Sequence, residues 1–509
     1  MGNDENSDDS GNNATDADDE TVVRRDRFSG GPAREFMSSL AGDSRIFDAD
    51  LAVDRAHVVM LAEQGIIDDE TAGEILGALA DVESAGHGSL PDGEDVHEAI
   101  ESAVIDHVGP DGGKMHTARS RNDEVATCIR YRLREDLLEA VETTLALRES
   151  LLDAAAEHTE TIMPGYTHLQ PAQPTTVGHY LSSYAAGVGR DTGRLLAAAD
   201  RANASPLGGA AFAGTPFDID RERTAELLGF DRVVDNAMDA ASARDFLAEA
   251  TAALAIHATT LSGLAEDIVV FANKGYIDLS DDYSSTSSIM PQKKNPDTLE
   301  LTRAVAGDAT GELTGLLTTL KGLPRAYNRD LQRAHPHTFR AVDAVVEASS
   351  IAAGAVATAE WNESTMAAAA AEGFSTATGI ADLLAMAGLP FRTAHEVVAL
   401  AAEAAEEDGG NGSDGNGAVS AAMLDSAAED VLGESLFAYV DEESVETALD
   451  PAASVASRDS LGGPAAEQVE ASIARAHESL AVDSDDLTAR REALAAADDR
   501  LQEAVDGYV

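Results

Sequence analysis

Two adjacent lysines lie in a polar loop, SSTSSIMPQKKNPD, that runs from Ser284 to Asp297. The whole chain holds five lysines against thirty arginines, so Lys293 and Lys294 are an unexpected pair. An ammonium is a compact point charge, whereas a guanidinium is a planar fork, so the pair indicates a site that needs a point charge. Composition alone would favour a solvated surface loop with two chance lysines.

Three other polar segments interrupt the predicted helices and carry residues suited to anion binding or proton transfer. They are HTARSRND at 116–123, GYTHLQPAQP at 165–174 and YNRDLQ at 327–332. Like the lysine loop, each lies at the end of a predicted long helix. Helix ends come together only as the helices pack, so these segments can form one composite site, although their spacing does not establish it.

Long helices must position these segments. From Asn122 to Glu160 the chain has no Gly or Pro, and apolar residues recur at i+4 spacing, which predicts a helix roughly 58 Å long. Helices of this length usually belong to a bundle. Further helices are expected at 175–202, 237–273, 298–320 and 336–361, with a Pro-rich loop at 163–174. Because no segment of any length alternates with the strand period, the expected fold is almost wholly α.

The sequence predicts an acidic tail followed by three helical domains. Residues 1–20 lack apolar periodicity and have the composition of a disordered tail. We expect an N-terminal helical domain over 21–121, a central long-helix bundle over 122–372 and a C-terminal helical domain over 373–509. The run EDGGNGSDGNG at 407–417 has linker composition and is expected to be a surface loop.

The charge balance limits the partners of this chain. Its formal net charge is -57, from 92 acidic and 35 basic residues, and a field of that sign repels nucleic acid and anionic membranes. Acidic residues occur along every predicted helix and lysine is scarce, which favours a surface adapted to very high salt over a cation-binding polyanion. With neither a signal peptide nor an apolar run of roughly 18 to 20 residues, we expect a soluble cytoplasmic protein.

Metal and cofactor motifs are weak or missing in the sequence. Cys128 is the single cysteine, so no intrachain disulfide can form, and its place in a predicted bundle helix favours packing over nucleophilic chemistry. His335 and His337 are two residues apart, but no cysteine or carboxylate cluster completes a metal site, so none is predicted. No GxGxxG or P-loop occurs, and no cofactor is expected.

The loop segment SSIMPQKKNP resembles the signature of the aspartase/fumarase superfamily of lyases, and its doubled lysine resembles the argininosuccinate lyase family within it. The similarity runs from about Arg27 to Gln468. It implies an all-α fold of three domains, a long-helix bundle that assembles with three other subunits, and active sites built from three chains. The other segments that resemble this family, in its order, are EDVHEAIE (94–101), GGKMHTARSRND (112–123), GYTHLQPAQP, MDAASARD (238–245), LAEDI (264–268), LPRAYNRDLQ (323–332) and LPFRTAHEVV (389–398).

The resemblance implies that argininosuccinate is cleaved into arginine and fumarate by β-elimination. Removing a proton beside a carboxylate builds extra negative charge, which a fixed cation must stabilise. Ser287 matches the family's base, Lys293 its cation and Asn295 an orienting donor. The alternative for Ser287 is a loop hydroxyl that satisfies backbone donors, and Ser288 is then the candidate base.

By the same resemblance, His168 matches the histidine that protonates the leaving nitrogen, and Glu300 matches its carboxylate partner. The alternative for His168 is a structural loop histidine. Two helix starts remain open near Glu300. Asp297 and Glu300 fit a capping box, whereas Asn295 followed by Pro296 fits an N-cap that would leave Glu300 free for His168.

Six residues match the family's substrate contacts, and the two arginines among them suit bidentate recognition of carboxylates. The alternative for the arginines is ion pairing on a helix surface, and for the others it is packing or capping. The six are Arg121, Asn122, Thr167, Arg244, Tyr327 and Gln332.

The sequence departs from the family pattern at three positions. Thr286 replaces a glycine before the serine pair, which is expected to stiffen the loop. His335 replaces a lysine, so a cationic substrate contact becomes pH dependent or is lost. Asp54 puts an acid where a serine usually contacts substrate. Lys294 has no assigned role.

Rival functions share most of these features. Fumarase, aspartase and adenylosuccinate lyase perform the same elimination with other leaving groups, and QKKN together with YNRDLQ favours argininosuccinate. A noncatalytic helical structural protein would be expected to lack the base or the lysine, and both Ser287 and Lys293 are present.

Overall fold

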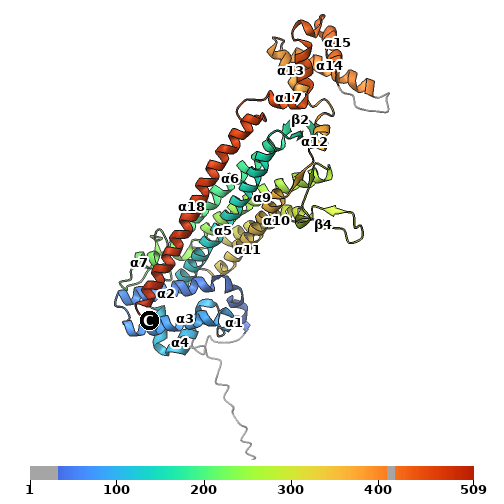
Figure 1. Cartoon of the computed structure of the whole chain (residues 1–509). Helices are drawn as coiled ribbons and strands as arrows, with labels where there is room; N and C mark the ends of the chain where they lie inside the picture. The colour runs from blue at the N-terminus through green and yellow to red at the C-terminus, as the bar shows by residue number, and fades with distance from the viewer. Residues whose placement is uncertain (1–31, 410–418) are drawn as a thin grey trace, which may run out of the picture.

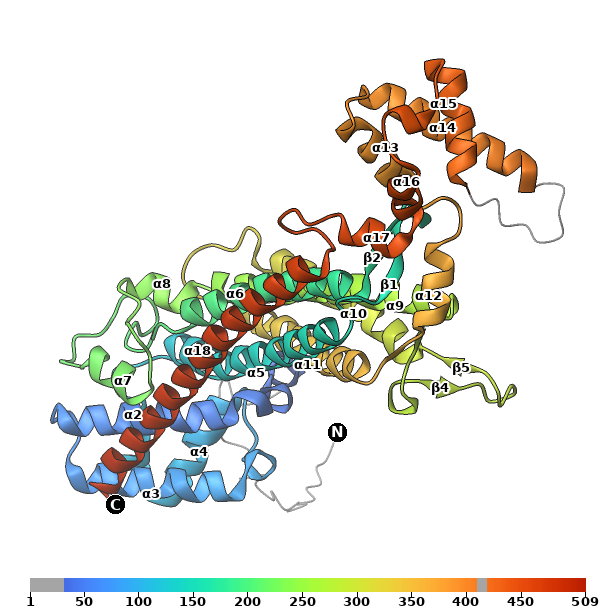
Figure 2. The same cartoon turned by 45° about the horizontal axis from the view of Figure 1, so that its top comes forward.

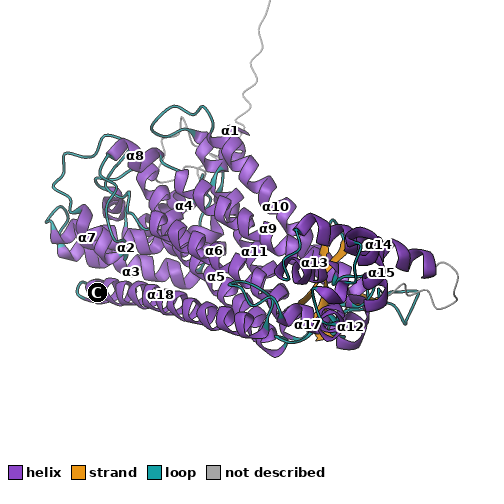
Figure 3. Cartoon of the chain, turned by 90° about the horizontal axis from the view of Figure 1, so that it is seen from above, coloured by secondary structure: helices purple, strands orange, loops and turns teal. Residues whose placement is uncertain are grey.

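The computed structural model describes residues 32–409 and 419–509, and the chain is almost wholly α-helical there, as predicted (Figures 1 and 3). The acidic tail at 1–20 and most of the 407–417 insertion lie outside these residues. Three short antiparallel strand pairs are the only sheet structure in the described ranges.

One end of the molecule is a layer of shorter helices (Figure 1). It contains α1 (Pro32–Met37), α2 (Phe47–Glu63), α3 (Asp69–Ala85) and α4 (Val96–Val108). The layer packs on the start of α5 (Arg121–Glu157), which has a capping box between Ser120 and Asp123. The layer and α5 share one hydrophobic core, so the first turn of α5 is held firmly in place.

The bundle consists of long helices packed side by side. Besides α5 it contains α6 (Val177–Ala202), α9 (Asp245–Asn273), α10 (Asp297–Leu320) and α11 (His335–Ala357). The i+4 pattern that predicted α5 is its buried stripe, because Ile129, Leu133, Leu137 and Val141 are all inaccessible to solvent. α9 is the one helix of the described ranges long and apolar enough to cross a membrane by length and composition, contrary to our expectation of no such run, and half of that window is buried.

A helix of 41 residues, α18 (Ala466–Asp506), runs along the bundle back to the N-terminal layer (Figures 1 and 2). Its buried Ile473 belongs to the core at one end of the bundle and its buried Leu501 to the core at the other. A separate core is formed by buried residues of α13 (Ala377–Met386), α14 (Phe391–Gly409), α15 (Ala421–Leu432) and α16 (Glu442–Leu449). We therefore propose that α18 belongs with the bundle and not with the expected domain of 373–509.

Two predicted helix boundaries are wrong. The helix expected over 237–273 is broken into α8 (Ala237–Ser242) and α9 because Ala243 is extended. The helix expected to reach Trp361 ends at Ala357, and the short strand β6 (Glu360–Trp361) then pairs with β3 (Ile277–Asp278).

The predicted loop at 163–174 is a β-hairpin of β1 (Ile162–Thr167) and β2 (Gln170–Thr176). Its two turn residues, His168 and Leu169, both have positive φ, 56° and 58°, which is the backbone of a type I′ turn. Such a conformation costs about 1 kcal/mol or more for residues other than glycine. Strain of this kind at a hairpin tip that carries a histidine favours a functional role for the tip over a structural one.

Candidate active site

A cavity of about 160 Å³ opens between the N-terminal layer and the bundle. Arg121 and Asn122 in the first turn of α5 line it, as does Arg244 immediately before α9, so the positive ends of two helices lie near the cavity and favour an anion there. Five of the six predicted substrate contacts line it, namely Arg121, Asn122, Arg244, Tyr327 and Gln332.

Arg244 is a buried cation without a carboxylate partner in the described part of the chain. Arg244 is the residue immediately before α9, and it is 3% exposed. Nη1 donates to the carbonyl oxygen of Ala243 at 2.9 Å, whereas Nε has no hydrogen-bond acceptor, and no ion pair involves Arg244 within 32–409 and 419–509. Burial lowers the pKa of Arg244 to about 10. An unpaired buried charge is costly, so this guanidinium is prepared to receive an anion such as a carboxylate.

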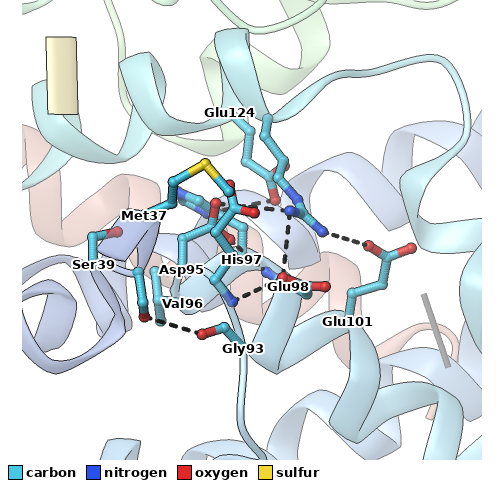
Figure 4. A network of polar contacts seen from close by, with 12 residues as sticks. Met37, Ser39, Gly93, Asp95, Val96, His97, Glu98, Glu101 and Glu124 are labelled. Atoms are coloured by element: carbon cyan, nitrogen blue, oxygen red, sulfur yellow. Dashed lines mark hydrogen bonds and ion pairs between the residues drawn. The ribbon is translucent and has the colours of Figure 1, made fainter. Parts of the chain in front are cut away.

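Arg121 is surrounded by carboxylates. Its guanidinium lies 3.8 Å from Asp95, 3.8 Å from Glu98 and 4.0 Å from Glu101, and Figure 4 shows these acids gathered beside His97. Burial would lower the pKa of Arg121, but the surrounding carboxylates outweigh it and raise the pKa. The ion-pair alternative is therefore partly right. The distances exceed hydrogen-bond length, so N–H groups of Arg121 can still turn to a ligand.

Two amides of the cavity are anchored by backbone groups. Asn122 Nδ2 donates to the carbonyl of Ala211 at 3.1 Å, and Gln332 Nε2 donates to the carbonyl of Met37 at 3.1 Å. Tyr327 is partly buried, and that burial raises its pKa, so its hydroxyl remains protonated and can donate. These side chains are held in place as neutral donors around the two arginines.

His335 and Asp54 are two of the three residues that depart from the family pattern, and the structure shows what surrounds each of them. His335 lines it, and burial lowers the pKa of His335 to about 3, so the ring is neutral and the cationic contact is lost. Asp54 does not line the cavity. Its carboxylate is buried 2.5 Å from Arg119, so the acid faces an internal cation in place of the substrate.

A testable consequence concerns acid stability. His335 is neutral when folded and titrates near 6.5 when unfolded, so the unfolded state binds more protons between about pH 3 and 6.5. The contribution of His335 to stability therefore falls as the pH drops below 6.5. We expect His335→Gln to remove about 1.4 kcal/mol of that loss per pH unit between pH 6 and 5. Urea unfolding in molar salt measures the slope, with the exposed His395→Gln as control. Equal slopes for both variants would refute the neutral assignment.

Thr167 and His168 lie far from the cavity in the same chain. They follow α5, whose 37 residues span roughly 55 Å from Arg121 to the hairpin. Thr167 ends strand β1, and His168 is the first residue of the strained turn. One chain therefore cannot bring these two groups to the cavity that its own Arg121 lines.

The lysine loop is a small hairpin that projects from the bundle (Figure 2). Strand β4 (Ser285–Thr286) pairs with β5 (Lys294–Asn295). Thr286 sits in an extended strand and lacks the positive φ that would require glycine, so a β-branched residue suits that position. The stiffening expected from Thr286 is thus compatible with the backbone of the loop.

Ser287 accepts hydrogen bonds from the backbone of its own loop. Its Oγ lies 3.1 Å from the Met290 nitrogen and 3.4 Å from the Ile289 nitrogen. This is the structural alternative expected for Ser287, a loop hydroxyl that satisfies backbone donors. The same contacts also have a chemical consequence. Two N–H donors aimed at one oxygen stabilise its anionic form, as an alkoxide base requires. Ser288 Oγ is exposed and makes no such bond to the described residues.

The two lysines have different surroundings. Lys293 is exposed, and its backbone bonds to Ser287 and Met290 close the loop. Lys294 Nζ lies 3.1 Å from Asp278 and 3.0 Å from Asp281. Lys294, to which the sequence assigned no role, thus ties the base of the loop to the segment after α9, and Lys293 remains the lysine whose ammonium can reach a ligand.

Both predicted starts of the next helix are wrong. α10 begins at Asp297 with Pro296 as its N-cap, and no side chain caps it. The Asp297 carboxylate instead accepts a hydrogen bond from the Ser285 hydroxyl. Glu300 is exposed, and no contact joins it to His168 within the described chain, so a pairing of the two would need a second subunit.

The helices separate the site residues into two groups. α9 has 29 residues, roughly 44 Å, between Arg244 and the lysine loop, and α10 has 24, roughly 36 Å, between Asn295 and Tyr327. The cavity therefore carries Arg121, Arg244 and Tyr327, and the opposite parts of the bundle carry Ser287, Lys293 and His168. The described chain does not bring the two groups together.

Sequence reasoning missed a buried charged cluster beneath the cavity. Asp50 and Asp54 lie on α2, and Glu124 and Cys128 on α5, each pair at i,i+4 spacing on a buried face. Charged residues at core positions were the signal that could have found them. Carboxylate and thiol groups here are close enough to hold a metal, but His97 and Arg119 already supply the positive charge between them, so we assign none of these residues as metal ligands. His337, one of the two histidines considered for a metal site from the sequence, instead pairs with Glu312.

The bundle of long helices with polar segments at its ends is the fold of an all-α lyase of the aspartase/fumarase class. A family model described as Lyase matches residues 33–311, and one described as Argininosuccinate lyase C-terminal matches 374–456. A crystal structure of EDDS lyase in complex with formate is similar, with TM-score 0.85 and 34% identity over 94% of this chain and 96% of that one.

Sequence relatives narrow the class further. The argininosuccinate lyase of Natronomonas pharaonis is 68% identical over 487 residues, 96% of this chain and 97% of that protein. The argininosuccinate lyase of Haloarcula marismortui is 65% identical over 493 residues, 96% of this chain and 97% of that protein. The chain belongs to the argininosuccinate lyase family, and the resemblance noted from its motifs is confirmed.

Proposed function

We propose that this protein cleaves argininosuccinate to arginine and fumarate, as a step in arginine biosynthesis. The observation that carries the proposal is the buried, unpaired Arg244 beside Arg121 in a cavity with anchored neutral donors. That cavity suits a ligand rich in carboxylates, which argininosuccinate is. The relatives named above support the particular leaving group.

The proposed chemistry is a β-elimination. Ser287 as alkoxide takes a proton from the succinyl carbon, the carbon–nitrogen bond breaks, and His168 protonates the departing guanidino nitrogen. Lys293 stabilises the extra negative charge on the adjacent carboxylate, and Asn295 orients it. The two N–H groups that point at Ser287 Oγ favour the alkoxide before substrate arrives.

We propose that the complete site forms in a homotetramer. The separation of the anion cavity from Ser287 and His168 by roughly 36 to 55 Å of helix supports sites shared between subunits. In that arrangement Glu300 of one chain orients His168 of another, and Thr167 reaches substrate bound at a neighbour's cavity. The exposed Leu301 and Leu317 on α10 offer apolar surface for such an assembly.

Fumarate release tests the proposed function directly. Fumarate absorbs in the ultraviolet, so turnover of argininosuccinate can be followed without coupling enzymes. The proposal predicts steady release from argininosuccinate by the unmodified protein in molar salt. The absence of release by folded tetramers would contradict it.

We also infer that the protein works in a high-salt cytoplasm, because the net charge of -57 repels itself strongly when unscreened. The Debye length grows from about 3 Å in 1 M salt to about 10 Å in 0.1 M salt. Dialysis from molar salt to about 0.1 M is therefore expected to reduce the helical circular dichroism signal substantially. An unchanged spectrum would contradict adaptation to high salt.

A further inference from the structure

Five ionisable side chains are buried together beneath the cavity. His97 Nδ1 lies 2.8 Å from Asp50 Oδ2 and 3.7 Å from Glu124 Oε1. Arg119 Nη2 lies 3.1 Å from Glu124 and 2.5 Å from Asp54. The proposed mechanism uses none of them.

His97 is the member of this cluster that also lines the cavity, together with Arg121 and Arg244. Its Nδ1 edge faces Asp50 and Glu124, so the opposite edge, which carries Nε2, is the one available to a ligand. The second oxygen of Asp50 accepts a bond from Cys128 Sγ at 3.3 Å, which holds the carboxylate in position behind the ring. Figure 4 shows His97 among the acids Asp95, Glu98 and Glu124.

The surroundings of His97 are mostly anionic. Burial alone would lower the pKa of His97, but the nearby carboxylates of Asp50 and Glu124 outweigh it and raise the pKa to about 10. His116 and His335 also face it, and burial lowers the pKa of each to about 3, so both are neutral. The charged groups that act on His97 come from the segment before α2, from α2 itself, from the start of α4, from the segment before α5 and from α5. They are Asp43, Asp50, Asp54, Asp95, Arg119 and Glu124.

We propose that His97 is a third substrate-binding cation of the cavity, an imidazolium that binds a carboxylate of the substrate beside Arg121 and Arg244, with Asp50 as its positioning residue. The inference rests on the proposed function, whose substrate carries three carboxylates. The cavity would then offer one cationic donor for each carboxylate of the substrate.

The test uses His97→Gln and Asp50→Asn in the full tetramer. KM and kcat for argininosuccinate are measured by fumarate absorbance, and the dissociation constant of succinate, a dicarboxylate probe, is measured by calorimetry. His97→Gln is expected to raise both KM and the succinate constant about tenfold or more, with a smaller change in kcat. His57→Gln is the control, because His57 is buried, bonds the Thr117 carbonyl and does not line the cavity.

Asp50→Asn adds a pH profile of binding, which a purely structural role of Asp50 would leave unchanged. Without that carboxylate the imidazolium loses its proton in the ordinary range, so KM and the succinate constant should rise from pH 6 to 8, whereas the unmodified protein stays flat. Folded variants with unchanged KM and unchanged succinate binding would overturn the inference, and so would a flat Asp50→Asn profile if His97→Gln does not fold. Failure of the unmodified protein to release fumarate would instead overturn the proposed function.

Discussion

Replacement of Ser287 by alanine is expected to lower kcat for argininosuccinate cleavage by about 10³-fold or more. The hydroxyl is the one group of the loop that receives two backbone N–H donors, from Ile289 and Met290, and these donors stabilise an alkoxide. Alanine keeps the backbone bond to Lys293, so the loop should keep its shape. Helical circular dichroism and oligomeric state should therefore stay unchanged.

Ser288→Ala is the matched control for this variant, because Ser288 is its exposed neighbour in the same loop. It is expected to keep kcat within a few-fold of the unmodified protein. Fumarate absorbance in molar salt measures both variants. Substantial turnover by Ser287→Ala, or a comparable loss in Ser288→Ala, would move the base away from Ser287.

Mixing two inactive variants is expected to restore activity. Arg244→Ala removes the buried cation of the cavity, a loss of about 10²-fold or more in kcat/KM, and Ser287→Ala removes the base. Suppose that a site takes Arg244 from one chain and Ser287 from another. In a random equal mixture of the two variants, the chance that the site's Arg244 is intact is one half, and so is the chance that its Ser287 is intact. About one quarter of the sites, the product of the two chances, should then be complete. Subunits can be exchanged by co-expression with distinct tags, and the mixed tetramers assayed for fumarate release.

The control mixture combines Ser287→Ala with Lys293→Ala. Both residues belong to one loop, so no chain in that mixture supplies an intact loop, and activity should stay near the level of the single variants. Recovery in the control, or no recovery in the Arg244 mixture, would contradict sites shared between subunits.

The bundle helices could be predicted from the sequence where one apolar stripe dominates. The prediction failed where no such stripe dominates. α5 was predicted because its i+4 apolar residues form one stripe, which is buried apart from the partly buried Val125. α18 was missed because its 41 residues include few buried apolar side chains, spread thinly along one face. The hairpin at 162–176 was missed because prolines hide the strand pattern, and because His168 and Leu169 occupy turn positions that glycine or asparagine normally fills.

The site followed from motifs only in part. Arg121, Asn122, Arg244, Tyr327 and Gln332 converge on one cavity as expected. No contact joins His168 to Glu300 within the described chain, although both residues lie at the end of the bundle opposite the cavity, so their pairing could not be predicted from helix positions alone. The charged cluster around His97 was not predicted because its members come from α2, α4 and α5 and meet only as these helices pack, although the charged residues at core positions were a usable signal.

The most direct measurement of the central claim is ultraviolet absorbance of fumarate when the unmodified protein is offered argininosuccinate, malate, aspartate and adenylosuccinate separately in molar salt. We expect fumarate from argininosuccinate alone. Fumarate from one of the other three, with none from argininosuccinate, would contradict the assigned leaving group while leaving the elimination chemistry in place.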